Sequence, residues 1–237
     1  MKGTLVHRAL QLLFTEYPRG SRSRPAAQAS LDAAWQEQQG GEELEGLTLD
    51  EAETAAFISD ARVLVDHYLE LEDPDSVSAI GLEPNLSTEL DGVTVRGIID
   101  RLDELDDGSL AVVDYKTGRA PRTEQSRSRL SGVQMYALMC ESELGRRPSV
   151  VRLLYLRDRI VISAAPTDQT MRGTRQRALG VWSAIERACR QDDFRPNPSS
   201  LCRFCAFQAY CPSFGGDPAL AASALEAAGV ASGSSPA

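Results

Sequence analysis

The order of hydrophobic and polar positions predicts helices in the first third of the chain and strands in its middle. Near the start, apolar residues recur every three or four positions, which is the period of a buried helical stripe (Val6, Ala9, Leu10, Leu13 and Tyr17). A helical insertion is predicted at about 30–73. It contains a short helix at 30–39 and a longer one that opens with the capping box Thr48-x-x-Glu51 and ends before Asp73-Pro74.

From residue 78 the pattern changes to runs of β-branched residues, which are typical of strands. The predicted elements that follow are strands at 80–90, 93–102 and 110–116, a helix at about 124–144, a strand pair at 150–156 and 159–164, and a long helix from Thr167 to about 191. This order predicts an α/β fold, in which a central mixed sheet is flanked by helices.

The two strands at 93–102 and 110–116 are predicted to pair as a hairpin. If its turn is a three-residue loop centred on Asp107, Asp100 and Asp114 lie opposite each other, and Lys116 shares the face of Asp114. Opposed side chains are roughly 5 Å apart at Cβ, so the two carboxylates could share a divalent cation. A two-residue turn at Asp107-Gly108 would shift the register by one and separate them.

Each of these aspartates ends an apolar run, where an unpaired charge is costly to bury. Two close carboxylates also repel each other unless a proton or a cation lies between them, and Mg²⁺ or Mn²⁺ prefers such oxygen ligands. Lys116 is one of only two lysines among 25 Lys and Arg residues, which indicates a role that needs an ammonium group. The alternative is a charged hairpin in which Lys116 only pairs with a carboxylate.

The set of Asp100 and Asp114-x-Lys116, with Gly3-x-x-x-His7 upstream and Gln134-x-Tyr136 downstream, resembles the PD-(D/E)XK nucleases and specifically the RecB family. The resemblance covers most of residues 3–213. It implies a restriction-endonuclease-like sheet and a metal-dependent DNA exonuclease that acts in repair or recombination. It also implies that His7 joins Asp100 and Asp114 as a metal ligand and that Lys116 positions the attacking water.

Glu83 stands where this family often places an acidic residue, so it is a further candidate for the metal site; an ordinary edge-strand glutamate is the alternative. The family usually has Gln-x-x-x-Tyr on its downstream helix. The spacing here puts the two side chains about 200° apart, so only one can face the groove fully. Gln134 is the favoured catalytic contact to the substrate, and Tyr136 is expected half in the core.

A net charge of −9 argues against a protein that coats DNA through a generally basic surface. A local basic groove is still expected, because the stretch from Lys116 to Arg129 is rich in arginine, and Arg119, Arg122 and Tyr136 are assigned to DNA binding. No apolar run approaches a membrane span and no signal peptide opens the chain, which predicts a soluble, cytoplasmic protein without a membrane partner. DNA that is single-stranded or has a free end is the expected partner, together with a helicase.

Three of the five cysteines form the pattern Cys202-x-x-Cys205-x5-Cys211, which suits a metal site or cluster better than disulfides. Zinc and iron–sulfur sites normally take four ligands, and no histidine lies nearby. By the family resemblance, the triplet joins a cysteine upstream of the Gly-x-x-x-His helix in a 4Fe–4S cluster. No such cysteine is present here. We favour a missing start of the chain; the alternatives are Cys189 or Cys140 as the fourth ligand, or no cluster.

The predicted organisation is a nuclease core at 1–193, a cysteine-rich segment at 194–216 and a disordered tail at 217–237. Two functions of other classes remain open. The first is a non-catalytic DNA-binding scaffold subunit of a helicase–nuclease complex, and the second is a zinc-stabilised interaction module. The intact Asp/Asp/Lys set favours the enzyme, since a scaffold does not need both carboxylates and the ammonium.

Overall fold

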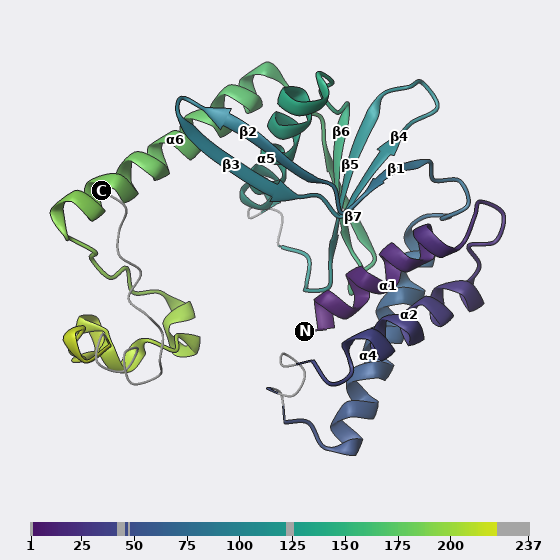
Figure 1. Cartoon of the computed structure of the whole chain (residues 1–237), viewed down its shortest axis with the longest axis horizontal. Helices are drawn as coiled ribbons and strands as arrows, with labels where there is room; N and C mark the ends of the chain where they lie inside the picture. The colour runs from purple at the N-terminus through teal and green to yellow at the C-terminus, as the bar shows by residue number, and fades with distance from the viewer. Residues whose placement is uncertain (1, 42–45, 47, 122–125, 222–237) are drawn as a thin grey trace. The chain divides into compact units, whose positions relative to one another are not determined.

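The computed structural model describes residues 2–41, 46, 48–121 and 126–221, which divide into two compact units on either side of the boundary between Val181 and Trp182 (Figure 1). The helices are α1 (Lys2–Glu16), α2 (Arg24–Gln38), α4 (Glu51–Leu71), α5 (Ser126–Leu144) and α6 (Asp168–Gln191). The strands are β1 (Ala79–Leu82), β2 (Asn85–Leu90), β3 (Val93–Ile98), β4 (Arg101–Glu104), β5 (Leu110–Lys116), β6 (Val150–Tyr155) and β7 (Ile160–Ala164).

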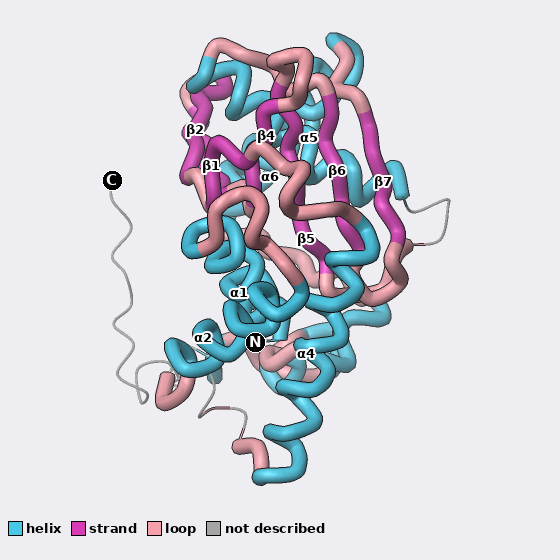
Figure 2. The backbone as a smooth tube through the Cα atoms, turned by 90° about the vertical axis from the view of Figure 1, so that its right-hand side faces the viewer, coloured by secondary structure: helices cyan, strands magenta, loops and turns pink. Residues whose placement is uncertain are grey.

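The first unit is built on a five-stranded sheet with the order β1-β4-β5-β6-β7, whose strands lie side by side in Figure 2. Strands β5 and β6 run parallel, and every other neighbouring pair is antiparallel. The parallel pair needs a crossover, which α5 provides. The sheet is therefore mixed and flanked by helices, as predicted.

Both faces of the central strand β5 are covered, which explains why this strand is apolar almost throughout. On one face, Val113 and Tyr115 belong to a core formed with α1, α2 and α4. On the other face, Leu110 and Val112 belong to a core formed with α5 and the start of α6. The last residues of β5, which carry the candidate chemistry, thus follow a strand that is packed on both faces.

Two predicted strands are each divided in the structure. Strands β2 and β3 form a separate two-stranded sheet, while β1 and β4 belong to the main sheet. The first division falls at Glu83, which has a φ of 48°, and Pro84, which cannot donate to a strand ladder. The second falls at Ile99 and Asp100. The prediction of single strands over 80–90 and 93–102 was therefore wrong.

Two helix starts also differ from the prediction. Helix α2 begins at Arg24, because Ser23 caps it and Pro25 is favourable in a first turn. Helix α4 is opened by a capping box of Asp50 and Glu53, whereas Thr48 has a φ of 45° and lies outside the cap. None of the described helices combines the length and apolar composition needed to cross a membrane.

Candidate active site

The hairpin of β4 and β5 has the register that the sequence predicts. Arg101 pairs with Val113 and Glu104 with Leu110, and the Leu105 N–H donates to the Ser109 carbonyl at 2.8 Å. The loop is therefore the three residues 106–108. Continued by one residue, this register sets Asp100 opposite Asp114.

Asp100 is held by two contacts. Its Oδ1 lies 3.2 Å from His7 Nδ1, and its Oδ2 accepts a 2.6 Å hydrogen bond from the Tyr115 backbone N–H. His7 comes from α1, whose first turn lies against the end of β5. A Cβ at Gly3 would lie 3.3 Å from Thr117 Oγ1, so the absence of a side chain there permits the close approach. In the motif Gly3-x-x-x-His7, the glycine thus lets α1 approach the end of β5, and the histidine on that helix reaches Asp100.

Asp114 and Lys116 point to the same face of β5, and the Lys116 Nζ lies 2.5 Å from Asp114 Oδ2. Asp114 Oδ2 is buried, and apart from this ion pair no hydrogen bond to it is found among the described residues. The Asp114 side chain is 6% exposed, whereas that of Lys116 is 43% exposed. A buried carboxylate oxygen in this state has lone pairs available for another ligand.

The charges of the cluster act on each other. Burial raises the pKa of Asp114, the negative charge of Asp100 raises it further, and Lys116 opposes both effects. Burial lowers the pKa of His7, but the hydrogen bond and charge of Asp100 outweigh it, so the pKa lies above the ordinary value. The raised pKa of His7, and the contribution of Asp100 to that of Asp114, reflect the negative charge gathered at this point, which favours the binding of a cation.

The donor set fits a divalent cation. Two carboxylates and one imidazole are suitable ligands for Mg²⁺ or Mn²⁺, and among the described residues no hydrogen bond is found to the buried Asp114 Oδ2. In the arrangement seen here the donors are engaged in pairs, His7 with Asp100 and Asp114 with Lys116. Within the described ranges, no group of three or more His, Cys, Asp or Glu side chains is already gathered as a metal site.

Two cavities open beside the cluster. The larger, of about 760 Å³, is lined by residues that include Asp114, Lys116, Arg119, Tyr136 and Tyr155. The other, of about 580 Å³, is lined by residues from α1 and α2 and by Glu83, and His7 is one of its walls. Glu83 is exposed and its backbone N–H donates to the Asp100 carbonyl at 3.1 Å. Of the side chains assigned to the metal, Asp114 thus lines the larger cavity, and His7 and Glu83 line the other.

Tyr136 is half-buried against the core, as expected, but Tyr136 and not Gln134 is the residue of this pair that lines the cavity. The Gln134 Oε1 accepts a 3.3 Å hydrogen bond from Thr174 Oγ1 of α6, and Gln134 does not line the cavity, whereas Tyr136 does. Burial, followed by the charges of Asp114 and Asp100, raises the pKa of Tyr136 to about 12. A Cβ at Gly97 of β3 would lie 3.1 Å from the Tyr136 ring, so this glycine leaves room for the ring.

Of the predicted DNA contacts, Arg119 lines the larger cavity together with Tyr136. Arg122 lies outside the described residues. A catalytic role for Gln134 stays a prediction, but its orientation toward α6 gives that role no support.

The cysteine triplet lies in the second unit, in and between three short 3₁₀ turns, Ser200–Phe204, Gln208–Tyr210 and Pro212–Phe214. All three thiols are free; Cys202 and Cys211 are half-buried and Cys205 is exposed. The Cys202 Sγ accepts a hydrogen bond from the Ser199 N–H at 3.3 Å. Cys140 is buried in the core of the first unit and Cys189 is exposed on α6. The iron–sulfur cluster stays a prediction.

Arg101 belongs to the surroundings of the site but was not among the residues predicted from the sequence. It follows Asp100 directly and is completely buried. Its signal in the sequence was the charged pair Arg101 and Asp103 alternating with apolar residues at the end of the strand pattern, which indicates an ion pair on a covered face.

Comparison with solved structures finds similar chains at low identity. One, from Eubacterium rectale and named "Putative exonuclease", is 12% identical, covers 87% of this chain and 80% of its own, and has a TM-score of 0.48. Another, named SSO0001, is 13% identical, covers 90% of this chain and 84% of its own, and has a TM-score of 0.41. No curated protein matches the chain significantly.

A family model described as the PD-(D/E)XK nuclease superfamily matches residues 1–212. The matched range includes α1 with His7, the β4–β5 hairpin with both aspartates, and Lys116. The mixed sheet, the paired acidic residues and this match over most of the chain lead to one conclusion: the chain belongs to the PD-(D/E)XK nuclease superfamily.

Proposed function

We propose that this chain is a divalent-metal-dependent exonuclease that hydrolyses phosphodiester bonds of DNA, in repair or recombination. The observation that carries the proposal is the buried carboxylate of Asp114, which lines the larger cavity together with Lys116, is paired with the Lys116 ammonium and lies within reach of the charge of Asp100. An isolated charged hairpin would not bury that carboxylate beside a second one.

Each residue of the cluster has a proposed role. Asp100, Asp114 and His7 would hold Mg²⁺ or Mn²⁺, which when bound polarises a phosphoryl oxygen and lowers the pKa of a water ligand. Lys116 orients the attacking water through its ammonium group and offsets charge that develops on the phosphate. The half-exposed position of Lys116 at the cavity is suited to this role, because the ammonium can reach the substrate.

The larger cavity is the proposed binding site for the strand. Arg119 supplies a cation for a phosphate, and Tyr136 supplies an aromatic face on which a base can stack. Glu83 stays a candidate for positioning the metal or a water from the second cavity. A helicase partner stays a prediction from the family resemblance.

The test is incubation of the purified protein with end-labelled DNA and Mn²⁺. Asp114→Asn and Lys116→Ala are each expected to lower kcat at least 100-fold, as removal of a group that stabilises charge in the transition state does. Lys2→Ala is the matched control, since Lys2 is the other lysine of the chain and pairs with Asp60 at 2.6 Å. Activity of both site variants equal to that of Lys2→Ala would refute the proposed mechanism.

The alternative, a DNA-binding scaffold subunit, gives a different result in the same experiment. It predicts no cleavage by the unaltered protein, and DNA affinity that does not change in Asp114→Asn. The intact Asp/Asp/Lys set favours the enzyme, because binding alone would be hindered by two carboxylates in the groove.

The cluster prediction is tested separately by the iron, sulfide and zinc contents of protein purified without oxygen. Iron and sulfide in equal amounts that are lost in Cys205→Ser would support the cluster, and zinc would support the interaction module instead.

A further inference from the structure

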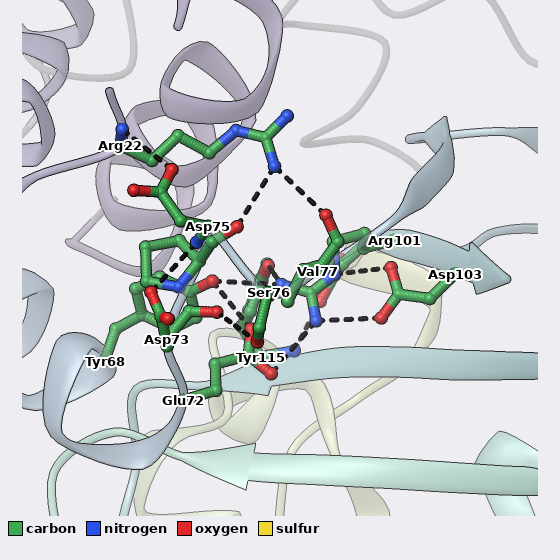
Figure 3. A network of polar contacts seen from close by, with 12 residues as sticks. Arg22, Tyr68, Glu72, Asp73, Asp75, Ser76, Val77, Arg101, Asp103 and Tyr115 are labelled. Carbon is green, nitrogen blue, oxygen red and sulfur yellow. Dashed lines mark hydrogen bonds and ion pairs between the residues drawn. The ribbon is translucent and has the colours of Figure 1, made fainter. Parts of the chain in front are cut away.

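A completely buried guanidinium lies directly behind the proposed site. Arg101 has no exposed surface, and Figure 3 shows the polar groups that surround its side chain. Its Nε and Nη2 donate to the two oxygens of Asp103 at 2.8 and 2.9 Å. Its Nη1 and Nη2 donate to the two oxygens of Glu72, the second at 3.1 Å. Each carboxylate is therefore bound by two parallel hydrogen bonds.

Two phenols complete this network, which we call the Arg101 network (Arg101, Asp103, Glu72, Tyr68 and Tyr115). The Arg101 Nη1 donates to the hydroxyl of Tyr115 at 2.7 Å and to that of Tyr68 at 3.1 Å. The Tyr68 hydroxyl in turn donates to Glu72 at 2.6 Å. Every N–H of the guanidinium has an acceptor, so the group is fixed in one orientation.

The Arg101 network lies on the face of the sheet that α1 and α4 cover, whereas Asp114 points to the opposite face. Tyr115 follows Asp114 in β5, where successive side chains point to opposite faces, and Arg101 directly follows Asp100. Tyr115 contacts Tyr68 of α4 with ring centroids 5.7 Å apart, while Asp114 lines the larger cavity. The hydrogen bond from Arg101 to Tyr115 therefore connects the neighbours of the two site aspartates.

A second connection runs back through the main chain. The Tyr115 N–H donates to Asp100 Oδ2, and the Tyr115 ring meets the His7 ring edge-on at 5.9 Å. The Arg101 guanidinium also lies 4.8 Å from the ring centre of Phe14, on the helix that carries His7. Tyr115 is thus in contact with two of the three proposed metal ligands and is itself held by Arg101.

Stability alone is a weak reason for such a network. Burying one guanidinium with two carboxylates incurs a large desolvation cost, and apolar replacements of buried ion pairs are often neutral or stabilising. Two neighbouring carboxylates at the site repel each other, however, and need rigid support to remain at one separation. The buried network provides that support from the covered face.

We propose that Arg101 and Tyr115 are positioning residues that fix the placement of Asp100 and Asp114 for metal binding. The part of this inference that concerns cleavage rests on the proposed nuclease function, and the part that concerns metal affinity does not. Neither residue touches the substrate, because both are buried on the other side of the strands.

The chain offers a matched pair of variants. Tyr115→Phe and Tyr68→Phe each remove one buried hydroxyl that accepts a hydrogen bond from Arg101, and both rings are at most 3% exposed. Only Tyr115 adjoins the site. A purely structural network predicts equal effects of the two substitutions, or a larger effect for Tyr68→Phe, which also loses the bond to Glu72.

The experiment measures Mn²⁺ affinity by electron paramagnetic resonance, together with kcat, KM and Tm. For Tyr115→Phe we expect a loss of Mn²⁺ affinity of about tenfold or more, as for other groups that support metal ligands, and a lower kcat with little change in KM. For Tyr68→Phe we expect less than a twofold change in Mn²⁺ affinity and in kcat, although its Tm should fall as much as that of Tyr115→Phe. Arg101→Lys keeps the charge but loses the fork, so it is expected to follow Tyr115→Phe.

The possible outcomes distinguish the positioning proposal from the proposed nuclease function. Equal Mn²⁺ affinities of the two phenylalanine variants would overturn the positioning proposal while leaving the nuclease function intact. Mn²⁺ binding without cleavage in the unaltered protein would refute the nuclease function. In that case the Mn²⁺ affinities of Tyr115→Phe and Tyr68→Phe would still test the positioning proposal. An unaltered protein that binds no Mn²⁺ would refute both.

Discussion

The Asp114 carboxylate combines burial with a close negative neighbour, and its pKa is raised as a result. A carboxyl group whose pKa is higher in the folded than in the unfolded state favours folding only while it is protonated. This contribution is complete below the ordinary pKa of the group and is lost as the pH rises through the folded value. At neutral pH the charged form therefore destabilises the fold.

Asp114→Asn is therefore expected to raise the Tm at pH 7, although it removes activity. Lys116, the partner left behind, is 43% exposed and can be solvated by water. The measurement is thermal unfolding of both proteins from pH 4 to 8. The difference in Tm should be small at the acidic end and should grow as the pH rises; a variant less stable at every pH would contradict the expectation.

A second residue-scale prediction concerns Gly97, where an added Cβ would lie 3.1 Å from Tyr136 and from Met139. Gly97→Ala should displace the Tyr136 ring, cost about 1 kcal/mol of stability or more, and weaken DNA binding. Gly173→Ala is the control, because that position lies in α6 with open space around it. It should stabilise the protein by about 0.5–1 kcal/mol and leave binding unchanged. Urea unfolding measures the stability of the two variants, and a DNA-binding titration measures their affinity.

The site could be predicted from the sequence where it depends on counting along paired strands. The positions of Asp100, Asp114 and Lys116 follow from strand alternation and a three-residue loop, and the register has that form. The orientation of Gln134 and Tyr136 could not be predicted in the same way. Two residues 200° apart on a helix leave the choice of face to tertiary packing, and the Thr174 hydroxyl and Gly97 decide it.

At the scale of elements, the boundaries that failed are those decided by a single backbone conformation. Glu83 adopts a positive φ, which could not be expected from a glutamate. One predicted strand is therefore divided into β1 and β2, which belong to two different sheets. Pro25 looks like a helix breaker but stands in a first turn. The long periodic segments, α5, α6 and the β6–β7 hairpin, lie where their patterns predicted.

The start of α4 provides a test at this scale. Asp50→Ala removes the side-chain acceptor of the Glu53 N–H, a 2.8 Å bond, and should destabilise the protein by about 1 kcal/mol. Thr48→Ala should change stability by less than half as much, because Thr48 is not in the cap. Chemical denaturation of both variants is the measurement. A larger loss in Thr48→Ala would restore the cap position expected from the sequence.

At the scale of the whole molecule, the net charge of −9 means that DNA must be attracted by local cations against an unfavourable average field. We expect affinity for DNA to fall steeply with salt. Arg119→Ala should reduce the slope of log K against log[salt] by about 0.7–0.9, the value for one phosphate contact. Arg62→Ala, which removes an arginine paired with Asp32 away from both cavities, should leave the slope unchanged. Fluorescence anisotropy over a salt series measures it.

The bond from the Tyr115 amide to Asp100 has a consequence for how this protein is mapped by mutagenesis. Because the donor belongs to the main chain, alanine or any residue other than proline at position 115 retains it. A scan of side chains would record the loss of the phenol and overlook the amide. Replacing the N–H of residue 115 by an ester oxygen through chemical synthesis would remove this donor and leave every side chain unchanged. The resulting change in Mn²⁺ affinity would measure the contribution of this one hydrogen bond.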